Sequence, residues 1–298
     1  MKYIGRFAPS PTGPLHFGSL VAALASYLDA RANEGRWLVR IEDVDETRCK
    51  LAHAANILHT LERFGFTWDD TVLYQSHRKP RYEAALQALA GRGLIYACIC
   101  SRREIADSAL NGIEGPVYSG TCRDAGHAFA GHALRVRTLD RSLLFTDRLH
   151  GDMVQKIESQ VGDFVVKRRD GLFAYQLAVV VDDAEQKITH VVRGADLLDS
   201  TARQIHLQQL LGYPTPAYLH IPVAMNASGQ KLSKQTWAPD ISTGDISQLL
   251  IRGLTFLGQP VAGLSILQPP AAILAAAAKR WRTTFIPQQR ALYCEEAQ

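Results

Sequence analysis

The sequence predicts an α/β protein with a parallel sheet, and three features support that prediction. A short apolar segment at residues 3–7 leads through a loop into a run whose apolar side chains recur with helical spacing. A second apolar segment, at residues 37–41, ends in acidic residues. Apolar segments and a helical pattern alternate again between residues 164 and 212. Strands that alternate with helices in this way are typical of parallel sheets covered by helices.

The first expected strand, residues 3–7, ends before a loop of prolines and glycine at residues 9–14, which neither a helix interior nor a strand accommodates. A helix then begins near Gly18 and Ser19, and Gly35 offers a stop. Further helices are expected at residues 51–64 and 82–89, with a short apolar element at 94–96.

The loop before the first helix has the composition of a phosphate-binding loop. Such a loop presents free backbone N–H groups and the positive end of the helix dipole. His16 would donate to charge that develops on a phosphate, and Gly18 leaves room for a flat base against the backbone. Alone, residues 16–19 favour a simpler interpretation, a surface histidine and a helix-capping glycine.

A second segment, more than two hundred residues later, changes that interpretation. Lys231 and Lys234 lie three residues apart in a turn-rich loop, and ammonium groups act as point charges on phosphoryl oxygens. By itself this segment could be a solvated basic loop. Together the two segments predict a nucleotide site; the catalytic roles of His16 and Lys234 are implied by the family resemblance given below.

Composition sets broad bounds on the protein. The chain has 298 residues, is 47% hydrophobic and 21% charged, and carries a net charge of +4, which is compatible with a polyanionic partner without identifying one. We expect no signal peptide, because the N-terminal apolar segment is short and leads directly into the loop at 9–14, and no membrane span, because the most apolar stretch, residues 271–278, is too short. Five cysteines, an odd number, fit a reducing cytoplasm in which they are thiols or metal ligands.

Three of these cysteines have a spacing that suits a metal ion. Cys98, Cys100 and Cys122 would supply three of the four ligands of a tetrahedral zinc site. His127 is the default fourth ligand by chemistry alone, with Tyr118 as the alternative; three free thiols without metal are the simpler interpretation. Four protein ligands would leave no open position, so such a site would be structural.

The second half of the predicted sheet begins near residue 164. The apolar run at 173–183, which ends in Asp182 and Asp183, predicts a buried strand, and residues 188–196 predict another, followed by a helix at 200–211. Helices are also expected at 246–257 and 271–281. The chain therefore divides into a first sheet half (1–97), an insertion with the cysteines (98–163), a second sheet half (164–212) and a segment with the lysine loop and helices (213–298).

Residues 6–19 and 231–235 together resemble the paired signatures of class I aminoacyl-tRNA synthetases, usually written HIGH and KMSKS. Residues 40–45 resemble the RIEDTD stretch of glutamyl-tRNA synthetases. The resemblance covers essentially the whole chain. It implies a Rossmann catalytic domain with a zinc-bearing insertion and a small C-terminal helical region, and no anticodon-binding domain.

The same resemblance implies roles for individual residues. Glu42 would meet the α-ammonium group of a glutamate substrate, and arginine side chains would grip carboxylates bidentately. The residues implied to bind glutamate are Arg6, Ala8, Ser10, Glu42, Tyr175 and Arg193, and those implied to bind ATP are His16, Gly18, Ser19, Lys231 and Lys234. A Cys-x-Cys, Tyr-x-x-x-Cys pattern is similar to the zinc site of short paralogues of glutamyl-tRNA synthetase, which implies one structural zinc ion on Cys98, Cys100, Tyr118 and Cys122.

The short paralogues also imply an activity. With ATP and Mg²⁺, L-glutamate would be activated to glutamyl-adenylate without tRNA, and glutamate would then pass to the queuosine base at the first anticodon position of tRNA(Asp). We expect a cytoplasmic monomer. Two alternatives are an ordinary synthetase that charges a tRNA 3′ end and a non-catalytic tRNA-binding relative.

Overall fold

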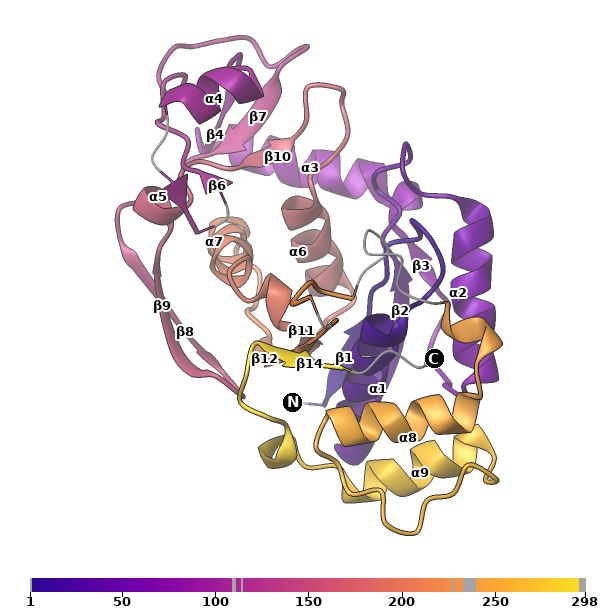
Figure 1. The fold of residues 1–298 in the computed structure, drawn as a ribbon. Coiled ribbons are helices and arrows are strands. Elements are labelled where there is room, and N and C mark those ends of the chain that lie inside the picture. Colours follow the sequence, from indigo (N-terminus) through magenta and orange to yellow (C-terminus); the bar gives the residue numbers. More distant parts are fainter. Residues whose placement is uncertain (1, 109–110, 114, 227, 233–239, 295–298) are drawn as a thin grey trace.

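A computed structural model describes residues 2–108, 111–113, 115–226, 228–232 and 240–294, and its central feature is a mainly parallel sheet in two separately paired halves, one of three strands and one of four (Figure 1). Strand β1 (Ile4–Phe7) pairs in parallel with β2 (Arg36–Ile41), which pairs with β3 (Leu73–Tyr74). On its other side β1 lies beside β11 (His190–Gly194), where the Thr189 N–H donates to the Ile4 carbonyl (2.9 Å). The α/β prediction is therefore confirmed.

The sheet continues beyond β11 into a part of the chain that is distant in sequence. Strand β11 pairs in parallel with β12 (Ala217–Ile221), β12 with β8 (Ser142–Asp147), and β8 forms an antiparallel hairpin with β9 (Gly151–Lys156). Strands β8 and β9 lie within the stretch assigned above to the insertion. The hairpin thus brings Asp147 to the second half of the sheet, a contact that sequence spacing does not indicate.

Helix α1 (Phe17–Ala32) occupies the centre of the molecule. It packs on β1, β2 and β11, and it also contacts α8 (Ile246–Phe256) and α9 (Pro270–Arg280), which lie beside each other below it in Figure 1. Asp29, a buried residue of α1, accepts hydrogen bonds from the Tyr3 hydroxyl (2.5 Å), Arg148 Nη1 (2.6 Å) and Trp281 Nε1 (3.0 Å). Through these hydrogen bonds, the Asp29 carboxylate connects the start of the sheet, the segment after β8 and the end of the C-terminal helices.

None of the helices in the described part of the chain combines the length and apolar character needed to cross a bilayer.

The remaining elements surround this centre. They are α2 (Leu51–Arg63), η1 (Gln75–Arg78), α3 (Lys79–Ala90), β4 (Ile95–Cys98), α4 (Arg102–Ser108), β5 (Asn111–Gly112), β6 (Gly115–Pro116), β7 (Ala133–Val136), α5 (Ile157–Gln160), β10 (Val165–Lys167), η2 (Ala195–Leu197), α7 (Thr201–Leu211), η4 (Ile241–Thr243) and η5 (Thr283–Phe285).

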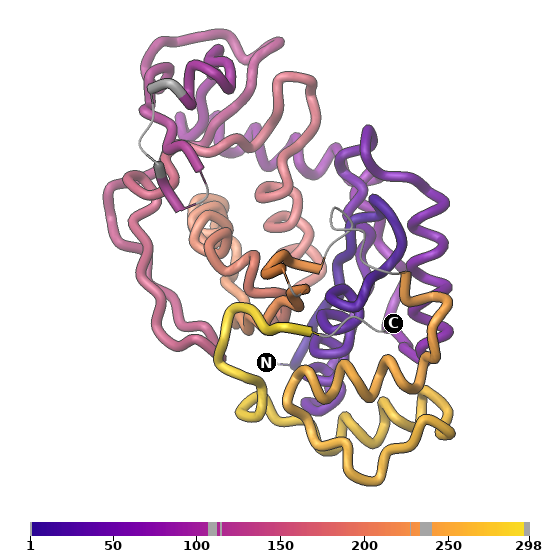
Figure 2. Tube along the Cα trace, in the orientation of Figure 1, coloured from indigo at the N-terminus to yellow at the C-terminus, as the bar shows by residue number. Residues whose placement is uncertain are grey.

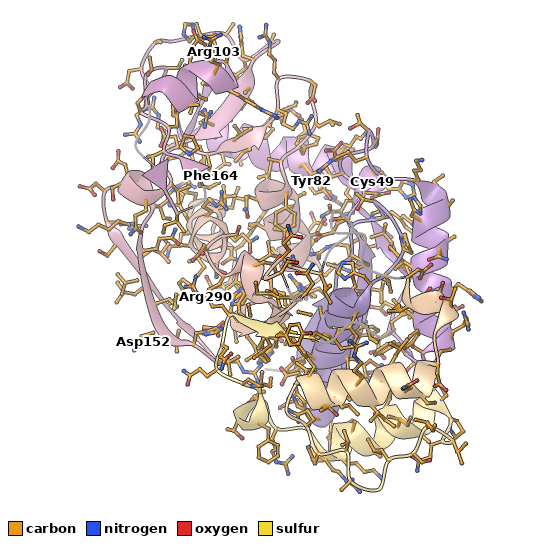
Figure 3. The ribbon with its side chains drawn as sticks, in the orientation of Figure 1. Cys49, Tyr82, Arg103, Asp152, Phe164 and Arg290 are labelled. Atoms are coloured by element: carbon orange, nitrogen blue, oxygen red, sulfur yellow. The ribbon has the colours of Figure 1, made fainter. Side chains whose placement is uncertain are left out.

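One expected strand is wrong. The apolar run at residues 173–183 forms a helix, α6 (Tyr175–Glu185), in which every side chain from Leu177 to Asp183 is buried. A helix buried on all sides shows no amphipathic period, so its sequence cannot be told from that of a buried strand. The two aspartates therefore lie on a helix; Tyr82, labelled in Figure 3, donates to Asp182 Oδ2 (2.7 Å).

The C-terminal part contains strands as well as the helices expected there. Strand β13 (Val223–Met225) follows β12 directly and pairs in parallel with β14 (Ala291–Tyr293). Figure 2 shows the yellow C-terminal segment returning to the middle of the molecule, where β14 meets β13. The last described residues thus contact the strand that precedes the lysine segment.

Candidate active site

The loop between β1 and α1 places His16 at the helix N-terminus. His16 is the N-cap of α1, and its Nδ1 accepts a hydrogen bond from the Ser19 backbone N–H (3.3 Å). Because Nδ1 is an acceptor, the neutral imidazole carries its proton on Nε2, where it can donate. A Cβ atom at Gly18 would lie 3.2 Å from the His16 ring and 3.4 Å from the Leu232 carbonyl oxygen, so glycine permits the close approach of the two segments.

A cavity of about 350 Å³ lies at the carboxyl ends of β1 and β11, where ligands of parallel sheets are usually bound. It brings the loop after β1 and the start of α1 against residues after β11 and the lysine segment. The expected ligand residues that line it are Ala8, Ser10, His16, Gly18, Ser19 and Lys231. Lys234, the other predicted catalytic residue, lies outside the described residues.

A smaller cavity of about 140 Å³ adjoins the first, since Ala8 and Gly194 line both. Its lining contains the other residues that the sequence assigned to a glutamate substrate: Arg6, Glu42, Tyr175 and Arg193. The structure therefore gathers side chains from β1, from the residue that follows β2, and from α6 and β11 around one small, strongly charged space. Their contacts with a substrate remain predictions.

Buried charges hold the smaller cavity in shape. Asp183 Oδ1 lies 3.3 Å from Arg6 Nε and 2.8 Å from Arg40 Nη1, and Arg40 Nη2 donates to Glu42 Oε1 (3.2 Å). All four side chains are buried. Burial alone would raise the pKa of Asp183, but the charges of Arg6 and Arg40 more than offset this and hold its pKa below the usual range. Asp183 is therefore ionised and fixes both arginines.

The cavity-lining groups keep polar atoms available for a ligand. In the described part of the chain, Nη1 and Nη2 of Arg6 make no hydrogen bond, and neither does Glu42 Oε2. Burial raises the pKa of Glu42, and Arg40 and Arg6 offset only part of that effect. Burial also raises the pKa of Tyr175 to about 12, so this side chain keeps its phenolic proton at neutral pH.

Most N–H groups of Arg193 are bound by other groups of the protein. Its Nε donates to His220 Nε2 (2.9 Å), its Nη1 to Gln204 Oε1 (2.8 Å), and its Nη2 to Thr201 Oγ1 (2.8 Å) and the Leu197 carbonyl (3.3 Å). A guanidinium group has five N–H bonds. Among the described residues, only one N–H, on Nη1, lacks a partner. Protein groups therefore take four of the five N–H bonds of Arg193, and its contact with a carboxylate stays a prediction.

The cysteine cluster forms as the sequence predicts. The sulfur atoms of Cys98, Cys100 and Cys122 all lie within 4.8 Å of one another, and the group can hold a metal ion. The Tyr118 hydroxyl lies 3.4 Å from Cys98 Sγ and 3.7 Å from Cys100 Sγ, and Cys100 Sγ lies 3.5 Å from Cys122 Sγ. A tetrahedral zinc ion with bonds of roughly 2.0–2.3 Å needs ligand atoms about 3.5–3.8 Å apart. The donor set fits.

The groups of this cluster differ in protonation: burial raises the pKa of the Cys100 thiol to about 11 and also raises the pKa of Tyr118, whereas the pKa of Cys122 is lowered. Burial opposes ionisation of Cys122, but hydrogen bonds from Tyr118 and neighbouring groups outweigh it and lower the pKa of this thiol to about 6. Cys122 therefore supplies a thiolate, the form that binds metals, at neutral pH. No histidine joins the three cysteines within the part of the chain that the structure describes, so the geometry favours Tyr118 over His127.

Sequence reasoning missed several residues of the site. Asp196 lines the larger cavity and binds Lys231 Nζ through Oδ2 (2.5 Å). The link from Asp147 to His220, and from there to Arg193, joins three strands. The charged end of the segment at 188–196 was a signal for Asp196, whereas no local pattern connects residues 147 and 220.

Known proteins resemble this chain along most of its length. The family model described as "tRNA synthetases class I (E and Q), catalytic domain" matches residues 3–268. The glutamyl-Q tRNA(Asp) synthetase of Pseudomonas putida strain GB-1 is 51% identical over 288 residues, which cover 97% of this chain and 96% of that protein. The protein of the same name from Thiobacillus denitrificans is 53% identical over 285 residues, 95% of each chain.

A solved structure shares the fold at lower identity. The crystal structure of the glutamate-tRNA synthetase of Elizabethkingia anophelis matches 98% of this chain with a TM-score of 0.79 and 23% identity. The match covers 68% of that longer protein. The similarity supports the class I synthetase catalytic fold that the sequence predicts.

A pH dependence of stability follows from His220. Burial lowers the pKa of this histidine from 6.5 to about 4, and the charge of Arg193 adds to the effect, with partial compensation by Asp147. Between these pH values the unfolded chain binds a proton at residue 220 and the folded chain does not. The free energy of unfolding should therefore keep its full value above pH 6.5 and decrease as the pH drops towards 4. At 1.36 kcal/mol per pH unit, the total decrease is up to about 3 kcal/mol.

Urea unfolding at a series of pH values measures this effect. The His220→Gln variant should lose less stability than the natural chain over the same pH interval, whatever its stability at neutral pH. Equal losses in the two proteins would contradict the assignment to His220.

Proposed function

The chain belongs to the family of class I tRNA synthetases for glutamate and glutamine, and on that premise we propose that it activates L-glutamate with ATP and transfers it to the queuosine of tRNA(Asp). The observation that carries the proposal is about 50% identity, over nearly the full length of both chains, to proteins named glutamyl-Q tRNA(Asp) synthetase. The charges of the smaller cavity support glutamate as the amino acid.

Glutamate carries two carboxylates and one ammonium group. Around the smaller cavity, Arg6 and Arg193 supply two positive charges and Glu42 one negative charge, while Asp183 is neutralised by Arg40. The cavity thus complements the net charge of the substrate. Both Nη atoms of Arg6 are open for a bidentate contact with a carboxylate, Arg193 offers one N–H, and Glu42 Oε2 would accept from the ammonium group.

The larger cavity would hold ATP. His16 and the start of α1, with Gly18 and Ser19, would meet the nucleotide, and Lys231 and Lys234 would meet the phosphates. The substrate carboxylate attacks the α-phosphorus, the bond to pyrophosphate breaks, and these donors stabilise the charge that develops. Mg²⁺ bound with ATP would neutralise phosphate charge. In the second step a queuosine hydroxyl attacks the glutamyl carbonyl, and AMP leaves.

The cysteine cluster would hold one structural zinc ion. Cys98, Cys100 and Cys122 would bind through sulfur and Tyr118 through its oxygen, in line with the donor separations given above. None of the five cysteines, all of which lie in the described part of the chain, forms a disulfide, which is in line with the reducing cytoplasm that we propose as the compartment. We also propose the four-part division at residues 97/98, 163/164 and 212/213, and a monomer that acts on tRNA.

The acceptor can be tested with labelled glutamate, ATP and Mg²⁺. We expect label on tRNA(Asp) from cells that make queuosine, and none on tRNA(Asp) from cells that do not. Removal of the 3′-terminal adenosine should leave the labelling intact, because the acceptor lies in the anticodon. Label that appears on both tRNAs and disappears with the terminal adenosine would instead identify an ordinary synthetase; no label on either would contradict the proposal.

Substitution of Arg6 tests the amino-acid site. Arg6→Lys keeps the charge but loses the planar fork, so the KM for glutamate in ATP–pyrophosphate exchange without tRNA should rise about 10–100-fold, with little change in the KM for ATP. Arg36→Lys is a matched control, since Arg36 pairs with Asp70 and lines neither cavity. An unchanged KM for glutamate in Arg6→Lys would argue against this role.

Metal analysis tests the zinc site. The purified protein should contain about one equivalent of zinc, and its removal by a chelator should lower the unfolding temperature. Tyr118→Phe should weaken zinc binding roughly tenfold or more, because it removes one of four ligands, whereas His127→Ala should leave it unchanged. If His127→Ala weakened zinc binding and Tyr118→Phe did not, the fourth zinc ligand would be His127.

A further inference from the structure

A chain of three buried polar side chains leads away from the smaller cavity. His220 Nε2 lies 2.9 Å from Arg193 Nε, and His220 Nδ1 lies 2.7 Å from Asp147 Oδ2. The exposed fractions of Asp147, His220 and Arg193 are 1%, 0% and 5%. The three residues come from adjacent strands, since Arg193 on β11 is the register partner of His220 on β12, and β8, which ends in Asp147, pairs with β12.

The two hydrogen-bond partners of His220 determine which ring nitrogen carries its proton. Arg193 Nε can only donate, so His220 Nε2 must be an acceptor, and the imidazole proton must lie on Nδ1. That proton points to Asp147, which also accepts from the backbone N–H of His220 (3.1 Å), Leu149 (3.0 Å) and His150 (3.0 Å). Asp147 thus selects the only tautomer that can accept from Arg193.

The other contacts of Arg193 leave it little freedom. Gln204, Thr201 and the Leu197 carbonyl take three further N–H groups, and the guanidinium carbon lies 5.3 Å from the ring centre of Tyr218. The orientation of the single remaining N–H is therefore determined by these partners. Of the side chains among them, only His220 is in turn held by a buried carboxylate, that of Asp147.

We propose that His220 and Asp147 are positioning residues that orient Arg193 for the carboxylate of the amino-acid substrate. The inference rests on the proposed function, because it assumes that Arg193 contacts glutamate. It adds two residues from β12 and β8 that touch neither cavity. Their effect on the substrate passes through the tautomer of one imidazole.

Asp147→Asn is the most direct variant. An amide placed with its NH₂ towards His220 makes Nδ1 an acceptor, which puts the imidazole proton on Nε2 against the N–H of Arg193. An amide turned the other way places its NH₂ against the N–H groups of Leu149 and His150. Either arrangement disturbs Arg193 while the volume of the side chain stays the same.

Calorimetric titration with L-glutamate measures the consequence without requiring turnover. Asp147→Asn should raise the Kd for glutamate about 10–100-fold, the range expected for one hydrogen bond to a charged group. The KM for ATP in pyrophosphate exchange should change less than about threefold, because the larger cavity is untouched. His220→Gln should have a smaller effect, since a glutamine carbonyl oxygen can accept from Arg193.

Two comparisons separate positioning from a purely structural role. His206→Gln is the matched control: His206 is also buried but bonds to the Arg137 carbonyl (2.9 Å), away from both cavities, so its substitution should leave glutamate binding unchanged. Introduced into an Arg193→Ala chain, Asp147→Asn should produce no further loss of glutamate affinity, because the two act as a unit.

An unchanged Kd in Asp147→Asn, with only a lower unfolding temperature, would overturn the proposal. The proposal would also be overturned if Asp147→Asn reduced glutamate affinity by the same factor in the Arg193→Ala chain as it does in the natural chain. If instead the natural chain itself fails to bind glutamate or to exchange pyrophosphate, the proposed function fails, which is a different result from unequal behaviour of the variants. Should Asp147→Asn not fold, His220→Phe, which keeps a planar ring but cannot accept from Arg193 Nε, carries the same comparison.

Discussion

The carboxylate of Asp183 is the group on which the smaller cavity depends. It lies between Arg6 on β1 and Arg40 on β2, and it comes from α6, a helix of the second half of the fold. Arg40 in turn holds Glu42. One buried anion therefore sets the positions of both a positive and a negative group that face the smaller cavity, and it joins the two halves of the sheet beside that cavity.

Such a cluster is a poor way to stabilise a fold. Burial of charged groups costs solvation free energy that mutual attraction recovers only with good geometry, and apolar replacements are often as stable. Here the geometry serves the cavity. The Nε atom of Arg6 is used internally and its two Nη atoms stay open, while one oxygen of Glu42 is used and the other stays open. Fixed, partly satisfied charges need little reorganisation when a zwitterion binds.

Arg193 obtains the same rigidity from neutral partners. A histidine whose pKa burial lowers to about 4 remains uncharged beside the guanidinium, so it accepts a hydrogen bond without repelling it. The carboxylate that controls this histidine lies on the β8–β9 hairpin, which extends the sheet on the side away from β1. The precision of the site is thus spread over strands β1, β2, β11, β12 and β8, rather than confined to the loops that line it.

The sequence by itself determined the parts that depend on neighbouring residues. The loop at 9–14, the helix that begins beside His16 and the close spacing of Cys98 and Cys100 are local features, because glycine, proline and helical periodicity act over a few residues. Only the tertiary structure decided that residues 175–185 form a helix, that Arg6 and not Arg193 keeps an open fork, and that Asp147 reaches His220. Burial removes the polar face that would reveal a helix, and hydrogen bonds between distant strands leave no periodic trace in the chain.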